Sequence, residues 1–213
     1  MTIQKSVLTV SRFIQAAALP LLLNWANFSF HDWPFLALLG LTIALAALAT
    51  TARPGTWTIA AFTLAIIGSS NQWALLPLAL AQAGLGWLLA TQKMSAKSAI
   101  SGWLIEVTFI QLMLSASLTH GLTTLVPVVF ALINALLLLS VWADQLPLWA
   151  LAVLILAGLG TGYWLQQFTL SFCAAVLVVL SVLNTRRIKA NMLPFTWAGI
   201  ALSLTFVLIR IHG

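Results

Sequence analysis

The stretch LPLWALAVLILAGLGTGYWL, from Leu146 to Leu165, decides the fold. It contains no charged residue, and polar pairs bound it on both sides, Asp144-Gln145 before it and Gln166-Gln167 after it. An α-helix needs about 20 consecutive, mostly apolar residues to cross the hydrocarbon of a bilayer. The stretch therefore predicts a membrane-spanning helix, and the segments on either side of it have the same character.

The composition extends this prediction to the whole chain. Charged residues make up 6% of the 213 positions and hydrophobic residues 62%, whereas about a quarter of the residues in a soluble domain are charged. A soluble protein with so few charges would expose mostly apolar side chains. In a bilayer the surroundings are themselves apolar, so the same composition is stable. We predict a single integral membrane domain over residues 1–213.

Polar residues divide the chain into about nine candidate spans, which predicts an all-α, polytopic transmembrane helical bundle. The short connections make consecutive helices antiparallel neighbours. The third candidate is short for a full span, so the count falls to eight if that segment is re-entrant. The sequence shows no convincing repeat, but an odd count leaves a four-plus-four arrangement with one extra helix possible. The candidates are Phe13–Phe30, Trp33–Thr51, Trp57–Ser70, Trp73–Thr91, Ala99–Thr119, Leu122–Trp142, Leu146–Leu165, Phe168–Asn184 and Leu193–Ile211.

The basic residues predict the orientation. With the N-terminus in the cytoplasm, nine spans place all the basic residues except Arg210 on the inner side, as the positive-inside rule favours. Arg210 lies close enough to the end of the last helix to reach the interface. The C-terminus then lies on the opposite side, and we expect a plasma or inner membrane. The inner residues are Lys5, Arg12, Arg53, Lys93, Lys97, Arg186, Arg187 and Lys189.

The ten tryptophans also fall near the predicted helix ends. Indole rings favour the membrane interface, because an apolar body carries one polar N–H. We interpret them as two aromatic belts, although an aromatic cage for a ligand is the alternative. The outer belt is Trp25, Trp33, Trp73 and Trp164, and the inner belt is Trp57, Trp87, Trp103, Trp142, Trp149 and Trp197.

Glu106 is the most informative polar residue, because it is the one acidic residue inside a predicted span. A carboxylate at that depth costs at least ~2.5 kcal/mol on insertion scales unless it is paired or protonated. Buried amides recur at Gln82, Gln111 and Asn134. These four residues are candidates to line a substrate pathway, and the alternative is that they join helices by hydrogen bonds.

Other motifs predict packing rather than chemistry. His31, His120 and His212 all fall on the predicted outer side, so they are weak candidates for a metal site, but their wide spacing matches no compact motif. The Gly158–Gly162 stretch contains a Gly-x-x-x-Gly pair inside an apolar span, which favours close helix packing over nucleotide binding. We expect no cofactor.

The sequence contains no recognisable catalytic set. A second carboxylate for acid–base hydrolysis is missing from the spans. The size and compact helix count resemble the lysoplasmalogenase family of membrane hydrolases. Gly68-Ser69 and Ser181-Val182 stand where that family has a glycine or serine followed by aspartate, and both aspartates are missing here. The resemblance therefore implies no catalytic residue in this chain.

The leading hypothesis is a small carrier or permease component for an apolar or weakly polar solute, because Glu106 and the amides lie inside spans without catalytic partners. A non-catalytic membrane subunit or assembly factor is the alternative, and a lipid-modifying membrane enzyme is the second alternative. The expected partners are membrane lipid and, for the subunit hypothesis, another membrane protein. Nucleic acid is excluded, because the basic residues are scattered between apolar runs and form no clustered face.

Overall fold

The computed structural model describes residues 2–48, 50, 54–121, 125–184 and 191–212. Within these residues the chain forms nine α-helices and two short 3₁₀-helices, and no strand. The predicted all-α helical bundle is therefore confirmed as a class. The elements are α1 (Thr2–Leu23), η1 (Trp25–Asn27), α2 (Trp33–Leu48), α3 (Pro54–Gly68), η2 (Trp73–Leu75), α4 (Leu76–Thr91), α5 (Ala96–Thr119), α6 (Val126–Trp142), α7 (Leu148–Trp164), α8 (Leu170–Leu183) and α9 (Met192–His212).

The helices divide into two compact units. Unit 1 comprises Met1–Met94 and Phe109–Leu122, and unit 2 comprises Ser95–Thr108 and Thr123–Gly213. Unit 1 thus contains α1 to α4, unit 2 contains α6 to α9, and α5 contributes its second half to unit 1 and its first half to unit 2. This division agrees with the four-plus-four arrangement with one extra helix that the sequence left open.

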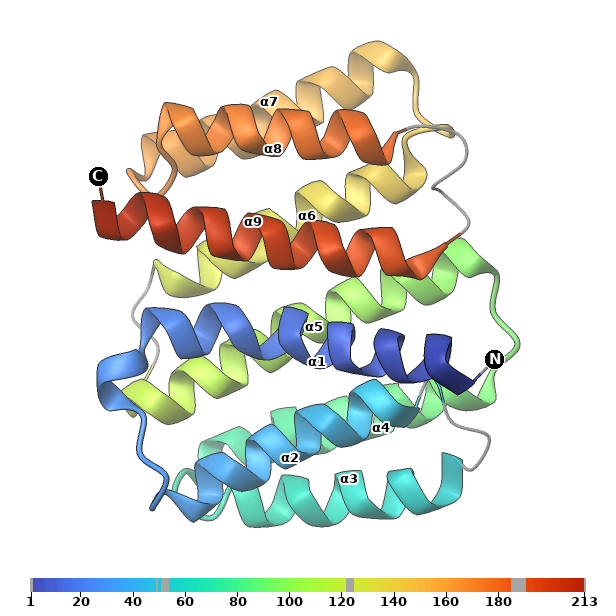
Figure 1. The fold of residues 1–213 in the computed structure, drawn as a ribbon, viewed down its shortest axis with the longest axis vertical. Helices are drawn as coiled ribbons and strands as arrows, with labels where there is room; N and C mark the ends of the chain where they lie inside the picture. Colours follow the sequence, from blue (N-terminus) through green and yellow to red (C-terminus); the bar gives the residue numbers. More distant parts are fainter. Residues whose placement is uncertain (1, 49, 51–53, 122–124, 185–190, 213) are drawn as a thin grey trace. The chain divides into compact units, whose positions relative to one another are not determined.

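In unit 1, α2 is the central helix of the first four. It contacts α1, α3 and α4, and consecutive helices alternate in direction (Figure 1). Leu38, Leu41 and Leu45 of α2 are fully buried. Gly68 at the end of α3 permits a close approach to α2, because a Cβ added there would lie 2.5 Å from a methyl carbon of Leu38.

In unit 2, α6 takes the central place and contacts α7, α8 and α9. Here too, consecutive helices alternate in direction (Figure 1). A Cβ added at Gly158 of α7 would lie 3.1 Å from Leu136 of α6, and one at Gly162 would overlap the ring of Phe168, whereas Gly160 faces open space. The predicted packing role of the Gly-x-x-x-Gly pair is confirmed, and its neighbours are side chains.

Four helices are long and apolar enough to cross a membrane, judged by length and composition within the described residues. They are Gln4–Leu23, Trp73–Thr91, Ala96–Thr119 and Met192–His212. The other five helices are apolar but shorter; α3 has 15 residues and α8 has 14. The helix at the third candidate span is therefore one residue longer than the helix at the eighth.

The first helix is the one whose predicted bounds, Phe13–Phe30, were wrong. The α-helix runs from Thr2 to Leu23, and the chain then turns through η1. The charge pattern predicts Arg12 at the inner interface, but its side chain is buried inside the protein together with Ser11 and Gln15. The helix therefore continues through Arg12 with this side chain in the interior.

The surface is strongly apolar, as expected of a chain surrounded by hydrocarbon. Large side chains with most of their area exposed include Trp33, Leu148 and Trp164. Trp103 departs from the predicted inner belt, because only 2% of its side chain is exposed. It belongs to the core, since α5 is the most deeply buried of the four long helices.

Candidate functional site

The structure describes all four predicted pathway residues, and two of them belong to each unit. Gln82 on α4 and Gln111 on α5 belong to unit 1, whereas Glu106 on α5 and Asn134 on α6 belong to unit 2. Each side chain is at least 96% buried. Burial of four polar groups in so apolar a chain is costly unless each finds a partner or a polar ligand.

Gln82 is buried, with 3% of the residue exposed. Its Oε1 is also buried and accepts no hydrogen bond from the part of the chain that the structure describes. Gln82 lies in α4 beside the buried small residues Ala79 and Ala83. These alanines are the buried neighbours of Gln82 on α4, and their side chains are too small to surround its amide group.

Gln111 joins two helices of unit 1. Its Nε2 donates to the main-chain carbonyl of Gln15 at 3.2 Å, so α5 and α1 are linked at buried positions. Gln15 belongs to a buried polar group on α1 with Ser11 and Arg12. Sequence reasoning missed this group, although polar residues at spacings of one, three and four on an apolar helix are the signal of a polar face turned inward.

Further polar bonds connect other parts of unit 1. Asn24, one of the amides near the end of the first helix, donates from Nδ2 to the Pro20 carbonyl at 2.9 Å and to Ser115 Oγ at 3.3 Å. Thr9 and Thr50 share a bond of 2.6 Å between their hydroxyls. These contacts hold α1 against α5 and against the end of α2.

In unit 2, Glu106 and Asn134 are both buried, with 2% and 4% of their surface exposed. Asn134 Nδ2 donates to the Phe130 carbonyl of its own helix at 3.0 Å. That bond satisfies one donor of the amide within α6 itself.

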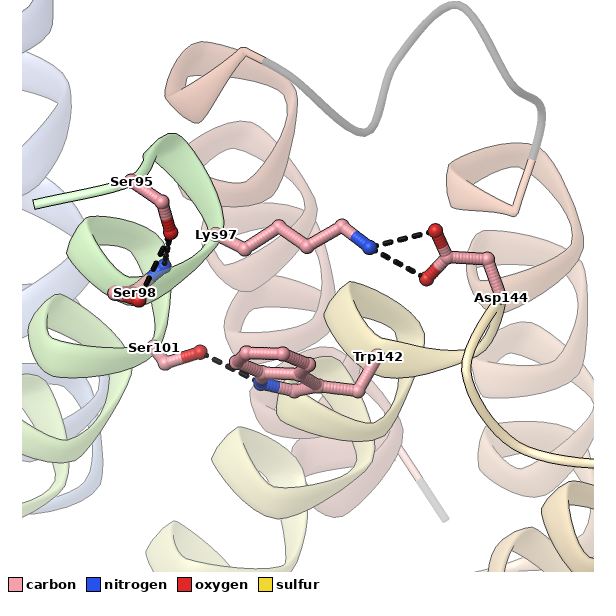
Figure 2. Close-up of polar contacts among 6 residues, drawn as sticks. All are labelled: Ser95, Lys97, Ser98, Ser101, Trp142 and Asp144. Carbon is pink, nitrogen blue, oxygen red and sulfur yellow. Dashed lines mark hydrogen bonds and ion pairs between the residues drawn. The ribbon is translucent and has the colours of Figure 1, made fainter.

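A polar cluster that sequence reasoning did not foresee joins the beginning of α5 to the end of α6 (Figure 2). Lys97 Nζ lies 2.7 Å from Oδ1 and 2.6 Å from Oδ2 of Asp144, and 5.7 Å from the ring centre of Trp142. Trp142 Nε1 in turn donates to Ser101 Oγ at 2.9 Å. The cation, the carboxylate and the indole hold two helix ends together, and both charges are satisfied within the cluster.

Within the described residues, His31, His120 and His212 belong to no group of side chains that could hold a metal ion. Among the described residues, no group of three His, Cys, Asp or Glu side chains lies together in a way that could hold a metal ion. His120 Nδ1 pairs with Gln72 Nε2 at 3.1 Å. His31 lies in the turn before α2, where Asp32 Oδ1 accepts from the Phe35 amide and caps the helix. Both turns therefore use polar side chains to satisfy backbone and ring groups.

Three pockets lie in unit 2, and none of them is lined by Glu106 or Asn134. The pocket of about 240 Å³ lies between the α7–α8 turn and the end of α9, and an adjoining groove of about 630 Å³ covers the end of α7. A pocket of about 110 Å³ lies between α6, α7 and α8. The described cavities and the predicted pathway residues of unit 2 are therefore separate features.

Comparison of the chain with known protein families, with curated proteins and with solved structures finds no match in any of the three. The functional argument therefore starts from the residues themselves.

Proposed function

We propose that the chain is an integral membrane protein with about nine spans, its N-terminus in the cytoplasm and its C-terminus on the other side of a plasma or inner membrane. The four long apolar helices and the five shorter ones support this arrangement. Lys5, Lys93 and Lys97 lie on the inner side in it. Arg53, Arg186, Arg187 and Lys189, which carry half of the predicted inner charge, lie outside the described residues.

Three side-chain pairs support this threading, because each joins two residues that the threading places on the same side of the membrane. Two pairs lie on the inner side and one on the outer side. An antiparallel bundle with short connections requires such same-side contacts between helix ends. The pairs are Thr9 with Thr50, Lys97 with Asp144, and Gln72 with His120.

We further propose that the protein is a small carrier or permease component for an apolar or weakly polar solute. The single observation that carries this proposal is the buried amide oxygen of Gln82, which has no hydrogen-bond partner among the described residues. Leaving a buried acceptor unsatisfied costs about 1–3 kcal/mol. A solute or a water molecule that passes α4 can donate a hydrogen bond to this oxygen. The glutamine then has a partner while the pathway is occupied.

Thiol accessibility tests the pathway without knowledge of the solute. Cys173 is the only cysteine, so a Cys173→Ser background carrying Gln82→Cys has one reactive site. We expect a hydrophilic maleimide to label position 82 at least ~10-fold faster than position 83 in the matched Ala83→Cys variant, because thiolate formation requires water. Ala83 is fully buried on the same helix. Equal labelling of the two positions would remove Gln82 from any pathway.

A transport assay tests Glu106 and Gln82 separately. Protein reconstituted in liposomes is given a panel of uncharged and weakly polar solutes, and uptake is compared with that of Glu106→Gln and Gln82→Leu variants. We expect both variants to lose most of the uptake, with Gln92→Leu as the control because Gln92 is exposed at the end of the same helix as Gln82. Unchanged uptake by Glu106→Gln would remove the proposed role of that residue.

The alternative function is a non-catalytic membrane subunit or assembly factor, and the bond of Gln111 favours it, because that amide joins two helices instead of facing a pathway. This alternative predicts that the protein co-purifies with a defined membrane partner and tolerates substitution of Glu106. The second alternative, a lipid-modifying enzyme, requires a converging set of polar groups that bind a reacting lipid, and a lipid-turnover assay on the purified protein tests it.

A further inference from the structure

The pocket of about 240 Å³ in unit 2 combines a cation, two amides and an aromatic floor. Arg210 from the last turn of α9 and Gln166 and Gln167 from the α7–α8 turn provide its polar side. Phe172 and Phe206 provide its apolar side. The volume is about eight times the ~30 Å³ that one water occupies in the liquid, which suits a small polar headgroup.

The polar side of the pocket contains hydrogen-bond donors, on the side chains of Arg210 and Gln166. Arg210 is exposed and makes no ion pair or hydrogen bond with the described part of the chain, and the side chain of Gln166 makes none either. Thr169 is used within the protein, because its Oγ1 accepts from the Phe172 amide. No carboxylate lines the pocket. An anion therefore meets a guanidinium that is not already neutralised.

The Gln166 backbone is explained by the end of α7. Gln166 has a φ of 57°, in the left-handed region, and the main-chain amides of Gln166 and Gln167 donate to the carbonyls of Tyr163 and Gly162. Helices commonly end with one residue in this conformation. The turn that follows places the exposed Gln166 in the lining of the pocket.

The apolar side of the pocket is a closely packed cluster of rings. The ring centres of Phe168 and Phe172 lie 4.8 Å apart, and those of Phe172 and Phe206 lie 5.3 Å apart, both in edge-to-face geometry. Gly162 makes room for Phe168 in this cluster. The floor thus offers a fixed aromatic surface under the cation.

A groove adjoins the pocket and shares Gln166 and Thr169 with it. Its other walls include Tyr163, Trp164 and Leu170, all more than half exposed. Tyrosine and tryptophan concentrate at the level of lipid headgroups. The pocket and the groove together place a charged site next to an apolar one at the end of the bundle.

We propose that this pocket binds the anionic headgroup of a phospholipid, with the phosphate on Arg210 and Gln166 and the acyl chains along the groove beside Trp164 and Leu170. The proposal rests on the membrane location proposed above and is independent of transport. It accounts for Arg210, the one basic residue that the positive-inside rule does not explain. In this proposal Arg210 binds a ligand and does not act as a signal for membrane topology.

Lipid retention tests the site. The full chain is placed in nanodiscs of equal phosphatidylglycerol and phosphatidylcholine with identical acyl chains, released, and the lipids that stay bound are measured by native mass spectrometry. We expect an about five-fold preference for phosphatidylglycerol, which is the effect of one basic residue near an anionic surface. Arg210→Gln removes the preference, Arg210→Lys keeps part of it, and Lys93→Gln, which changes an exposed lysine elsewhere, leaves it intact.

Three results would overturn the proposal. Equal retention of the two lipids by the unaltered chain would deny headgroup selection, and an unchanged preference in Arg210→Gln would deny the role of Arg210. Stabilisation by inorganic phosphate that depends on Arg210, without any lipid preference, would make the pocket a site for small anions. Failure of the chain to enter nanodiscs at all would instead contradict the membrane location, so the two proposals fail in different ways.

Discussion

Unit 1 joins its helices through side-chain hydrogen bonds along their length, whereas the interhelical bonds described in unit 2 gather at one end. In unit 1 the bonds of Gln111 and Asn24 link α5 and α1 at buried positions. In unit 2 the cluster of Lys97 joins the ends of α5 and α6, and edge-to-face phenylalanines fill the opposite end. In unit 1 buried hydrogen bonds therefore secure α1 to α5, whereas in unit 2 close aromatic packing secures the end opposite the polar cluster.

The membrane location proposed above gives this difference a physical basis. Apolar side chains gain no hydrophobic free energy by leaving lipid for a helix interface, so association depends on close packing and on interhelical hydrogen bonds. Unit 1 uses interhelical bonds between α1 and α5, and unit 2 uses close packing in its aromatic cluster. Volume changes should therefore be felt most in the aromatic cluster of unit 2, and loss of polar atoms most where α1 meets α5 in unit 1.

The largest expected effect is the loss of a ring from unit 2. Phe172→Ala deletes a side chain that is 1% exposed and touches Phe168 and Phe206, and we expect a loss of about 3–5 kcal/mol. Unfolding of the protein in mild detergent measures it. The control Leu177→Ala removes a half-exposed side chain of the same helix and should cost far less. Equal losses would mean that α8 is held without the aromatic cluster.

A smaller loss of stability is expected when one carbon is added at Gly162. Gly162→Ala places a Cβ in the ring of Phe168, and overpacking of this kind costs about 1–3 kcal/mol. Gly160→Ala, two residues earlier in an open position, should be neutral or stabilising by up to ~1 kcal/mol. The same unfolding measurement compares the two variants. If both behave alike, shape is not what fixes unit 2.

Unit 1 is probed by removal of its interhelical amide. Gln111→Leu deletes the donor to the Gln15 carbonyl, and we expect a loss of about 0.6 kcal/mol, the average for such bonds in a membrane protein, and of no more than about 1.7 kcal/mol. Gln92→Leu changes an exposed glutamine in the same unit and serves as the control. A stability gain in Gln111→Leu would show that apolar packing fixes unit 1 as well.

The smallest effect concerns the ion pair. Lys97→Gln breaks the contact with Asp144, but the two side chains are 24% and 45% exposed, so we expect a loss of about 0.2–1 kcal/mol. The loss should shrink as ionic strength rises, because salt screens partly exposed charges. Lys93→Gln should show neither effect. A loss that does not depend on salt would assign the stabilisation to the packing of Lys97 on Trp142.

Much of the architecture followed from the sequence, because apolar runs of spanning length and short polar connections leave few alternatives to an antiparallel bundle. The packing role of Gly158 and Gly162 could also be predicted from their spacing alone. The start of α1 could not, since a charge beside an apolar run marks the membrane interface unless the fold buries it, and the fold buries Arg12.

The candidate site was predicted only in part. Burial of Glu106, Gln82, Gln111 and Asn134 follows from their place in apolar helices, but their partners depend on which helices meet. The bond from Gln111 to a main-chain carbonyl leaves no trace in the sequence. Likewise, Lys97 and Asp144 are far apart in the chain, and their pairing required the beginning of α5 to be placed beside the end of α6.

In the nine-span arrangement proposed above, the shortness of α8 has a consequence for the lipid around it. Its 14 residues extend over about 21 Å at the α-helical rise, whereas the hydrocarbon of an ordinary bilayer is about 30 Å thick. A spanning helix of this length draws the two leaflets together locally, at a cost that grows with each ångström of mismatch. The proposal therefore predicts that the protein is most stable among phospholipids with short acyl tails, so that membrane thickness itself tunes its stability.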